Sequence, residues 1–303
     1  MSSKNLNYAG VCIAGCGDIG QRVAQLWLAR SVPVIGLVVS EDSLSRLSAH
    51  HIPAQLSDFN DPTVDLPTLS KPSLIYYFAP PPPSGIEDTR VAHFLQALSR
   101  QADKVTRIVA ISTTGVYGDC AGERVQETRP PAPQADRARR RLDMETQLRN
   151  WCDEHQVALI ILRVGGIYGP GRLPLQRIKE GVPVLYPELA PSTNRIHADD
   201  LADICVAAAH VDHAFRIYNI SDGSESNMTE YFFTLADYFH LPRPPAVGWE
   251  EAEQSISKGM LSYLRESRRV DNTRMLNELM PNLRYPNLLA GLASCRADES
   301  ETD

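Results

Sequence analysis

A glycine-rich turn near the start of the chain restricts the fold more than any other feature of the sequence: Gly15-Cys16-Gly17-Asp18-Ile19-Gly20. Residues 8–14 form a short apolar run that suits a buried parallel strand, and residues 21–30 carry apolar side chains at helical spacing. Between them, Gly15 permits a tight turn, Gly17 lets a pyrophosphate approach the backbone, and Gly20 lets the helix pack closely. Free N–H groups at the helix N-terminus attract anions. The turn therefore predicts a dinucleotide-binding site that includes all six of its residues.

Length and composition indicate one compact, enzyme-sized unit. The 303 residues are 43% hydrophobic, which is enough to bury a large core, and the formal net charge is −7. This balance offers no basic surface for nucleic acid or an anionic membrane. The start of the chain is polar, and no apolar stretch approaches the roughly 18 residues of a membrane span. We expect a cytoplasmic protein whose partners are small molecules.

The cysteines lack the spacing of a metal site or a disulfide framework, so we expect reduced thiols. Cys16 lies at a helix N-terminus, a position that would lower the pKa of its thiol beside the cofactor phosphates. The alternative, which the sequence favours, is a small residue tolerated in the turn. The six are Cys12, Cys16, Cys120, Cys152, Cys205 and Cys295.

Strand-like and helix-like segments alternate through the first half of the chain. This alternation predicts an α/β fold of Rossmann type, with a doubly wound parallel sheet and a ligand at the carboxyl ends of its strands. After the first strand, we expect strands at residues 33–39, 52–56, 73–79, 105–111 and 157–162, and helices at 43–50, 86–102 and 135–154.

The pattern changes to short strands and helices beyond residue 169. We expect residues 1–170 to form the dinucleotide-binding domain and residues 171–292 to form mainly a smaller, substrate-covering lobe. Residues 215–220 resemble a strand that returns to the main sheet. The acidic tail, residues 293–303, is expected to lack fixed structure.

The end of the second strand bears on the choice between NAD and NADP. An acidic residue there would accept the ribose hydroxyls of NAD, whereas a basic one would favour the phosphate of NADP. Ser40 can hydrogen-bond either ribose, and Glu41 or Asp42 would repel a phosphate, although Arg46 follows a turn later. The sequence leans to NAD and leaves NADP open. Alternatively, the two acids only begin the next helix, where its dipole favours them.

Four later segments change the interpretation: residues 112–118, 163–171, 194–202 and 218–223. In order and separation they resemble the "SS…VYG", "R…YGPG", "R.FIHVDDLA" and "YN…G" segments of extended short-chain dehydrogenases/reductases, the NAD-dependent epimerase/dehydratase family. The resemblance covers residues 8–292. It implies NAD or NADP as cofactor and hydride exchange with a sugar-nucleotide or another anionic carbonyl or hydroxyl substrate. A homodimer is a common arrangement in this family.

The resemblance also implies roles for single residues. It places the family's catalytic hydroxyl on Thr113, where it would hydrogen-bond or polarise a substrate oxygen, unless Thr113 only caps a turn. Asp58 matches an acidic position near the adenine, and Ala79 and Pro80 match the strand end that packs along the cofactor.

The chain departs from the family in residues 128–145, which align with the segment T.P..P.SPYGASKLAAE. Arg137 takes the place of the catalytic tyrosine and Arg141 that of the lysine four residues on. Arginine keeps its proton at any working pH, so Arg137 cannot shuttle one, whereas Arg141 could still bind the nicotinamide ribose. Glu145 shares their helical stripe and could lie between them. This arginine-rich segment forms either an anion site or an ordinary solvated helix face.

Another proton carrier would then be needed, and motif position makes Tyr117, Tyr168 and His197 the candidates, unless each is a packed loop side chain. Gly165 and Arg195 are the remaining candidates for substrate contacts. For Arg195 the alternative is a salt bridge to Asp199 or Asp200.

Two functions follow from these observations. The first is an atypical NAD(P)-dependent oxidoreductase or epimerase/dehydratase-like enzyme. The second is a dinucleotide-binding sensor or scaffold that has lost catalysis, which the absence of the tyrosine would explain. Retention of the Thr113 region favours the enzyme.

Overall fold

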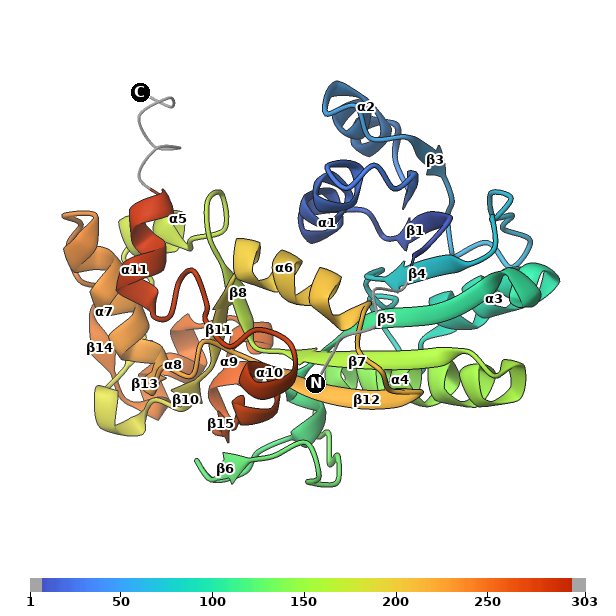
Figure 1. Ribbon diagram of the computed structural model, residues 1–303. Helices are drawn as coiled ribbons and strands as arrows, with labels where there is room; N and C mark the ends of the chain where they lie inside the picture. The colour runs from blue at the N-terminus through green and yellow to red at the C-terminus, as the bar shows by residue number, and fades with distance from the viewer. Residues whose placement is uncertain (1–6, 296–303) are drawn as a thin grey trace.

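A parallel sheet of seven strands forms the centre of the computed structural model, which describes residues 7–295 (Figure 1). The strands lie in the order β12-β7-β5-β4-β1-β2-β3, so strand order reverses beside β1. In sheets of this kind, a ligand binds outside the carboxyl ends of the strands at the reversal. The predicted Rossmann-type α/β fold is confirmed. The strands are β1 (Gly10–Ala14), β2 (Val34–Val38), β3 (Ala54–Leu56), β4 (Ser73–Tyr77), β5 (Val105–Thr113), β7 (Ala158–Val164) and β12 (Phe215–Ile220).

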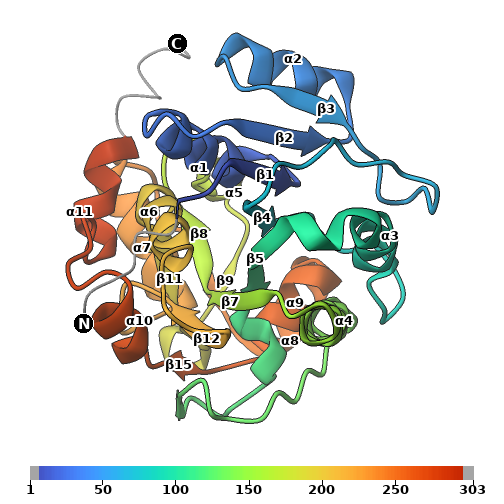
Figure 2. The same cartoon turned by 45° about the vertical axis from the view of Figure 1, so that its right-hand side comes forward.

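Helices cover both faces of the sheet, with α1 and α6 on one side of its central strands and α3 and α4 on the other (Figure 2). The strands are apolar on both faces for this reason. In β4, Leu74 and Tyr76 join the core beneath α1 and α6, whereas Ile75 and Tyr77 join the core beneath α3 and α4. The helices of this part are α1 (Asp18–Leu28), α2 (Glu41–Ala49), α3 (Thr89–Leu98), α4 (Asp136–His155) and α6 (Ala198–Ala208).

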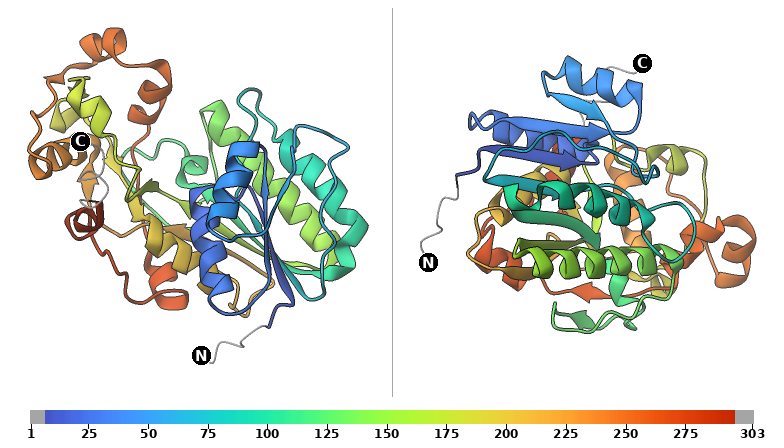
Figure 3. Two further views of the ribbon diagram at one scale, coloured as in Figure 1. Left: turned by 90° about the horizontal axis from the view of Figure 1, so that it is seen from above. Right: turned by 90° about the vertical axis from the view of Figure 1, so that its right-hand side faces the viewer.

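The remaining elements are short, and most gather in a lobe beside the sheet, where β7 leads into β8 (Figure 3, left). Two small apolar clusters hold this lobe together, one around Leu235 and one around Leu264. Its strands are β8 (Gly166–Tyr168), β9 (Val184–Leu185), β10 (Ser192–Thr193), β11 (Arg195–His197), β13 (Ser226–Asn227), β14 (Ala246–Val247) and β15 (Arg269–Val270), which pairs with β6 (Arg124–Val125). Its helices are α5 (Leu175–Lys179), α7 (Met228–Tyr238), α8 (Trp249–Ser255), α9 (Lys258–Leu264) and α11 (Leu288–Leu292), whereas α10 (Thr273–Glu278) packs against β12 of the sheet.

Four 3₁₀ helices complete the described chain: η1 (Ser99–Lys104), η2 (Thr114–Tyr117), η3 (Pro187–Leu189) and η4 (Ala293–Cys295). Since η4 ends on the buried Cys295, the tail does not begin at residue 293 as expected, and residues 296–303 lie outside the described part. Between residues 7 and 295, no helix is both long and apolar enough to cross a bilayer.

Two helices begin at other residues than expected, one of them because a polar side chain caps it. The helix expected from residue 86 begins at Thr89, where the Asp88 carboxylate accepts hydrogen bonds from the N–H groups of Arg90 and Val91. The helix expected from residue 21 begins at Asp18, inside the glycine turn.

Candidate functional site

The glycine turn joins β1 to α1 at the reversal of strand order. Gly15 has φ +83°, and a Cβ there would lie 2.5 Å from the backbone nitrogen of Ala79, so this approach of β1 to the end of β4 requires glycine. A Cβ on Gly20 would lie 3.2 Å from the Cys16 sulfur. A Cβ on Gly17 would meet no atom of residues 7–295 within 4 Å. Packing therefore requires glycine at position 15 and leaves little room beside Gly20, whereas Gly17 borders open space.

The start of α1 retains its capacity to bind an anion. Gly17 is the N-cap, and within the described chain no side chain caps the helix. The Asp18 carboxylate is occupied by Arg22, at 3.0 Å from its Nε, and by Arg172, at 2.7 Å from its Nη1. The first-turn N–H groups, which have no partners inside a helix, remain as donors.

The Cys16 side chain points away from this anion site. It is buried, and its sulfur would lie only 2.9 Å from a Cβ on Gly36 of β2. Burial raises the pKa of the Cys16 thiol to about 12, so the expectation of a lowered pKa is wrong. Cys16 is therefore a small residue packed within the turn, as the alternative interpretation predicted.

A largely apolar groove runs beside Gly15 at the carboxyl ends of β1 to β4. Four predicted cofactor residues meet in it: Gly15, Asp58, Ala79 and Pro80. Asp58 accepts hydrogen bonds from the backbone and side chain of Asn60, at 2.9 and 2.8 Å. The groove is lined by Gly15, Leu37, Val38, Val39, Ser57, Asp58, Phe59, Asn60, Ala79, Pro80 and Arg90.

Ser40 does not line this groove. Its hydroxyl accepts a hydrogen bond from the Ser43 N–H at 3.3 Å and caps α2, and Glu41 and Asp42 form the first turn of that helix. Glu41 and Asp42 therefore begin a helix whose dipole favours acidic residues, as the alternative interpretation predicted. Arg46 bonds the Ser43 hydroxyl at 3.0 Å.

The arginines at the start of α4 do not form one solvated face. Arg141 reaches the ends of two strands, with its Nη1 3.1 Å from the Ala79 carbonyl oxygen and 3.5 Å from that of Ile111. Burial lowers the pKa of Arg141. Arg140 is also buried, and only Arg139 is exposed. Arg141 thus lies beside Ala79, one of the residues that line the groove, but does not line the groove itself.

Glu145 does not lie between Arg137 and Arg141, which corrects that expectation. Its carboxylate pairs with Arg163 of β7 through two bonds, of 3.1 Å to Nε and 2.7 Å to Nη2. It also accepts a hydrogen bond of 2.5 Å from Ser112. All three side chains are buried, so they tie α4 to two strands of the sheet.

Thr113 ends β5, next to this buried pair. Its hydroxyl oxygen accepts a hydrogen bond from the Gly115 N–H at 3.1 Å and caps η2. Thr113 therefore caps a turn, as the alternative to a catalytic role predicted. Because its oxygen is the acceptor in this bond, the hydroxyl proton can still be donated.

Arg137 belongs to a polar cluster with three residues of the C-terminal lobe. Its Nη2 lies 3.5 Å from a Glu266 carboxylate oxygen, which is also 3.0 Å from Nη1 of Arg268. Its guanidinium carbon lies 3.7 Å from the ring centre of Tyr263. These lobe residues follow Arg137 by more than 120 positions and carry no local motif, so no sequence signal could have identified them.

Asn194 anchors the segment that leads from Arg268 into β15. Its side chain donates to the Arg268 carbonyl at 3.0 Å and accepts from the Val270 N–H at 2.8 Å. A Cβ on Gly165 would lie 2.6 Å from the Asn194 carbonyl oxygen. Gly165 is therefore required by packing between β7 and β11.

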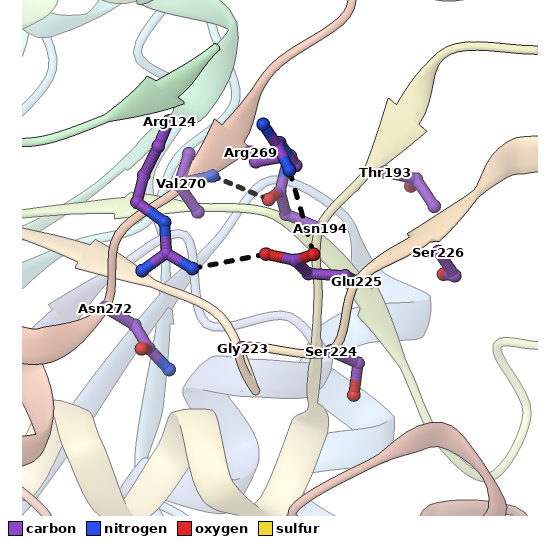
Figure 4. A pocket seen from close by; sticks show the side chains of 10 residues that line it. All are labelled: Arg124, Thr193, Asn194, Gly223, Ser224, Glu225, Ser226, Arg269, Val270 and Asn272. Atoms are coloured by element: carbon purple, nitrogen blue, oxygen red, sulfur yellow. Dashed lines mark hydrogen bonds and ion pairs between the residues drawn. The ribbon is translucent and has the colours of Figure 1, made fainter. Parts of the chain in front are cut away.

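A second, polar pocket lies on the other side of this strand (Figure 4). In this pocket the Glu225 carboxylate forms ion pairs with two arginines, at 3.2 Å from Arg124 and 3.7 Å from Arg269. The charged side chains of the pocket are therefore paired with one another. Its walls are Arg124, Thr193, Asn194, Gly223, Ser224, Glu225, Ser226, Arg269, Val270 and Asn272.

Tyr117 and Tyr168 are packed rather than exposed to a substrate. The Tyr117 hydroxyl donates to the Asn219 side chain at 2.7 Å, and the Tyr168 hydroxyl donates to the Asn287 carbonyl at 3.1 Å. Both rings are buried, which raises the pKa of each phenol. Both tyrosines are therefore packed side chains, as the alternative predicted, and neither is placed to transfer a proton to a substrate.

Arg195 is buried against a ring. Its guanidinium carbon lies 3.4 Å from the ring centre of Tyr231, and burial lowers the pKa of Arg195 to about 10. The alternative of a salt bridge is wrong, because Asp199 pairs with Arg22 and Asp200 accepts hydrogen bonds from two backbone N–H groups. Arg195 stabilises the lobe.

His197 caps α6. Its Nδ1 accepts a hydrogen bond from the Asp199 N–H at 3.2 Å, and its Nε2 lies 2.9 Å from the Ser294 hydroxyl. An acceptor Nδ1 requires a neutral ring with its proton on Nε2. Burial lowers the pKa of His197, which agrees with this form. The histidine therefore has a structural place inside the fold.

We expect His197 to make stability depend on pH. The folded state holds the ring neutral, whereas the unfolded chain takes up a proton near its ordinary pKa, so stability present above about pH 6.5 is lost as the pH falls below it. In urea unfolding, His197→Asn, which keeps an acceptor for the Asp199 N–H but cannot titrate, should show a shallower loss. The exposed His50→Asn is the control. A His197→Asn slope equal to that of the wild type would contradict this role.

Residues 11–221 match the sequence profile of the family described as NAD dependent epimerase/dehydratase. Protein YeeZ of Escherichia coli (strain K12) is 26% identical over 285 residues, which are 92% of this chain and 97% of YeeZ.

Solved structures share the fold. A functionally unknown conserved protein from Silicibacter pomeroyi DSS superposes with a TM-score of 0.83 at 28% identity and covers 96% of this chain and 99% of its own. UDP-glucuronic acid 4-epimerase from Bacillus cereus, in complex with NAD, gives 0.73 at 17% identity (96% and 99%). UDP-glucose 4-epimerase from Thermotoga maritima, with UDP-glucose, gives 0.75 at 16% identity (97% and 99%).

Proposed function

Since the chain belongs to the NAD-dependent epimerase/dehydratase family, we propose that it binds a nicotinamide dinucleotide and exchanges hydride with an anionic carbonyl or hydroxyl substrate. The observation that carries the proposal is the geometry of the glycine turn, where Gly17 borders open space beside an uncapped helix start. A pyrophosphate needs both features.

The residues around the turn fit the rest of such a cofactor. The apolar groove between Gly15 and Pro80 suits an adenine ring, and Asp58 lies at its side. Arg141, which is bonded to the carbonyl of the groove residue Ala79, would place its charge near the ribose or phosphates. We propose NAD over NADP because UDP-glucuronic acid 4-epimerase from Bacillus cereus, which shares the fold, was solved in complex with NAD.

The bound nicotinamide would supply hydride exchange, and the chain would orient the substrate. Thr113 would donate its hydroxyl proton to a substrate oxygen while its own oxygen stays bonded to the Gly115 N–H. Arg137 keeps its charge, and its Nη1 has no hydrogen-bond partner among residues 7–295 although it is buried. This favours a substrate with a phosphate or carboxylate group, and sugar nucleotides belong to that class.

Thr113→Val tests the enzyme. We expect turnover to fall about tenfold or more, because a hydrogen bond of about 1.5 kcal/mol made mainly in the transition state is lost, while cofactor affinity stays nearly unchanged. Sugar nucleotides and small carbonyl compounds would be screened by nicotinamide absorbance, with affinity from calorimetry. Thr113→Ser, which retains the hydroxyl, is the matched control.

The outcomes separate enzyme from sensor. Turnover that Thr113→Val leaves intact would remove Thr113 from the mechanism. A wild-type protein that binds the dinucleotide tightly yet converts no substrate in the screen would favour the sensor instead.

A further inference from the structure

A tyrosine of the C-terminal lobe covers the guanidinium of Arg137. Tyr263 lies on α9, and its ring centre is 3.7 Å from the Arg137 guanidinium carbon. Nη2 of Arg137 also lies 3.5 Å from both the Ser262 carbonyl oxygen and the Glu266 carboxylate. Arg268 holds that carboxylate from its other side at 3.0 Å. The position of the tyrosine ring is thus fixed by a network that joins α9 to the start of α4.

The hydroxyl of Tyr263 is accessible. The residue is 50% exposed, and in the part of the chain that the structure describes, no hydrogen bond occupies its oxygen. Arg141 lies close enough to Tyr263 for the two side chains to interact electrostatically. Burial lowers the pKa of Arg141, and the interaction with Tyr263 acts in the opposite direction. One phenol therefore lies near two guanidinium groups, and one of these is bonded to the carbonyl of Ala79, a residue that lines the cofactor groove.

The other ionisable candidates at the site are occupied. Tyr117 and Tyr168 are buried and donate their hydroxyl protons to fixed acceptors. His197 uses both ring nitrogens inside the lobe. Glu266 is held by two arginines. Proton transfer needs a group that a substrate oxygen can reach, and among these only Tyr263 has an accessible, uncommitted atom.

We propose that Tyr263 is the proton carrier of this enzyme, an inference that rests on the proposed function. In the oxidative direction, the substrate hydroxyl gives its proton to the deprotonated Tyr263 oxygen. The carbon of the same C–O bond gives a hydride, with its two electrons, to the oxidised dinucleotide, so the alcohol becomes a carbonyl and the dinucleotide is reduced. In the reverse direction, the Tyr263 O–H gives its proton to the carbonyl oxygen as hydride returns to the carbon.

The arginines have separate parts in this arrangement. Arg137 is a positioning residue, because its guanidinium packs on the face of the Tyr263 ring. Together with Arg141 it also stabilises the negative charge that develops on the reacting oxygens. The proton carrier comes from the lobe and the hydride carrier binds to the sheet. The site is therefore complete only while α9 packs against α4.

Chemical modification of the wild-type protein gives a test that needs no substrate. Tetranitromethane nitrates accessible phenols, and peptide mapping by mass spectrometry reports the rate at each tyrosine. Saturating NAD should slow the nitration of Tyr263 several-fold and leave that of Tyr186 unchanged, since Tyr186 is a comparably exposed tyrosine of the lobe at 44%. NAD that calorimetry shows to be bound, with no protection of Tyr263, would overturn the inference alone. Failure of the wild type to bind any dinucleotide would overturn the proposed function as well.

Kinetics provide the second measurement. Tyr263→Phe should keep the wild-type thermal unfolding temperature and NAD affinity, and its kcat should fall by about 10²-fold or more with little change in KM, as for the loss of a general acid–base group. Tyr186→Phe should retain wild-type turnover. Unchanged kcat in Tyr263→Phe would overturn the inference. If this variant fails to fold, the nitration experiment on the wild type still decides.

Discussion

Gly17→Val is expected to weaken NAD binding by about two orders of magnitude or more while leaving the fold intact. The new side chain would fill the space that the pyrophosphate needs, and each charge-assisted hydrogen bond lost there is worth about 1.5–3 kcal/mol. The fold should tolerate it, because a Cβ on Gly17 meets no atom of the described residues within 4 Å and φ is −81°. Calorimetry with NAD and a thermal unfolding curve would measure the two effects.

Two further glycines serve as controls for this experiment. Gly10→Ala should change neither property, because its Cβ would come no nearer than 3.9 Å to the Pro33 carbonyl oxygen. Gly15→Ala should lower the unfolding temperature, because its Cβ would clash with Ala79 and its φ is +83°. Wild-type NAD affinity in Gly17→Val would remove the cofactor from the glycine turn.

Glu145→Gln is expected to destabilise the protein by about 3–5 kcal/mol, because it leaves Arg163 as a buried charge without its counter-ion. The two side chains are only 3% and 5% exposed, and Nη1 of Arg163 already lacks a partner among the described residues. The amide keeps the shape of the carboxylate, so lost charge rather than lost volume should dominate. Denaturant unfolding would measure the change.

An exposed ion pair on the same helix provides the comparison. Asp153 and Arg149 are 58% and 38% exposed, so Asp153→Asn should cost less than about 1 kcal/mol. Equal unfolding midpoints for Glu145→Gln and the wild type would show that the buried pair adds no stability beyond that of the neutral amide.

Much of the fold could be predicted from the sequence because its signals are local. Apolar runs separated by helical patterns predict a parallel sheet, since both faces of its strands are buried. The glycine turn is also local in part: Gly15 has φ +83°, and a Cβ on Gly20 would lie 3.2 Å from side-chain atoms of the nearby Cys16 and Ile13. The same holds for the position of Arg141 on α4, one helical turn after Arg137.

The partners of these residues were decided only by the tertiary structure. Glu145 was expected to face Arg137 and Arg141, yet it pairs with Arg163, because packing α4 on the sheet turns Glu145 towards β7. Burial likewise directs Cys16, Tyr117 and His197 into packed positions, which a motif cannot reveal.

The sequence by itself determined the sheet, the glycine turn and the arginine-rich start of α4, because each depends on residues that are neighbours in the chain. The tertiary structure alone brought Tyr263 onto Arg137, a contact between helices whose residues are separated by more than 120 positions. Such contacts depend on how the lobe packs against the sheet, and the sum of many weak, nonlocal interactions sets that packing rather than any local pattern.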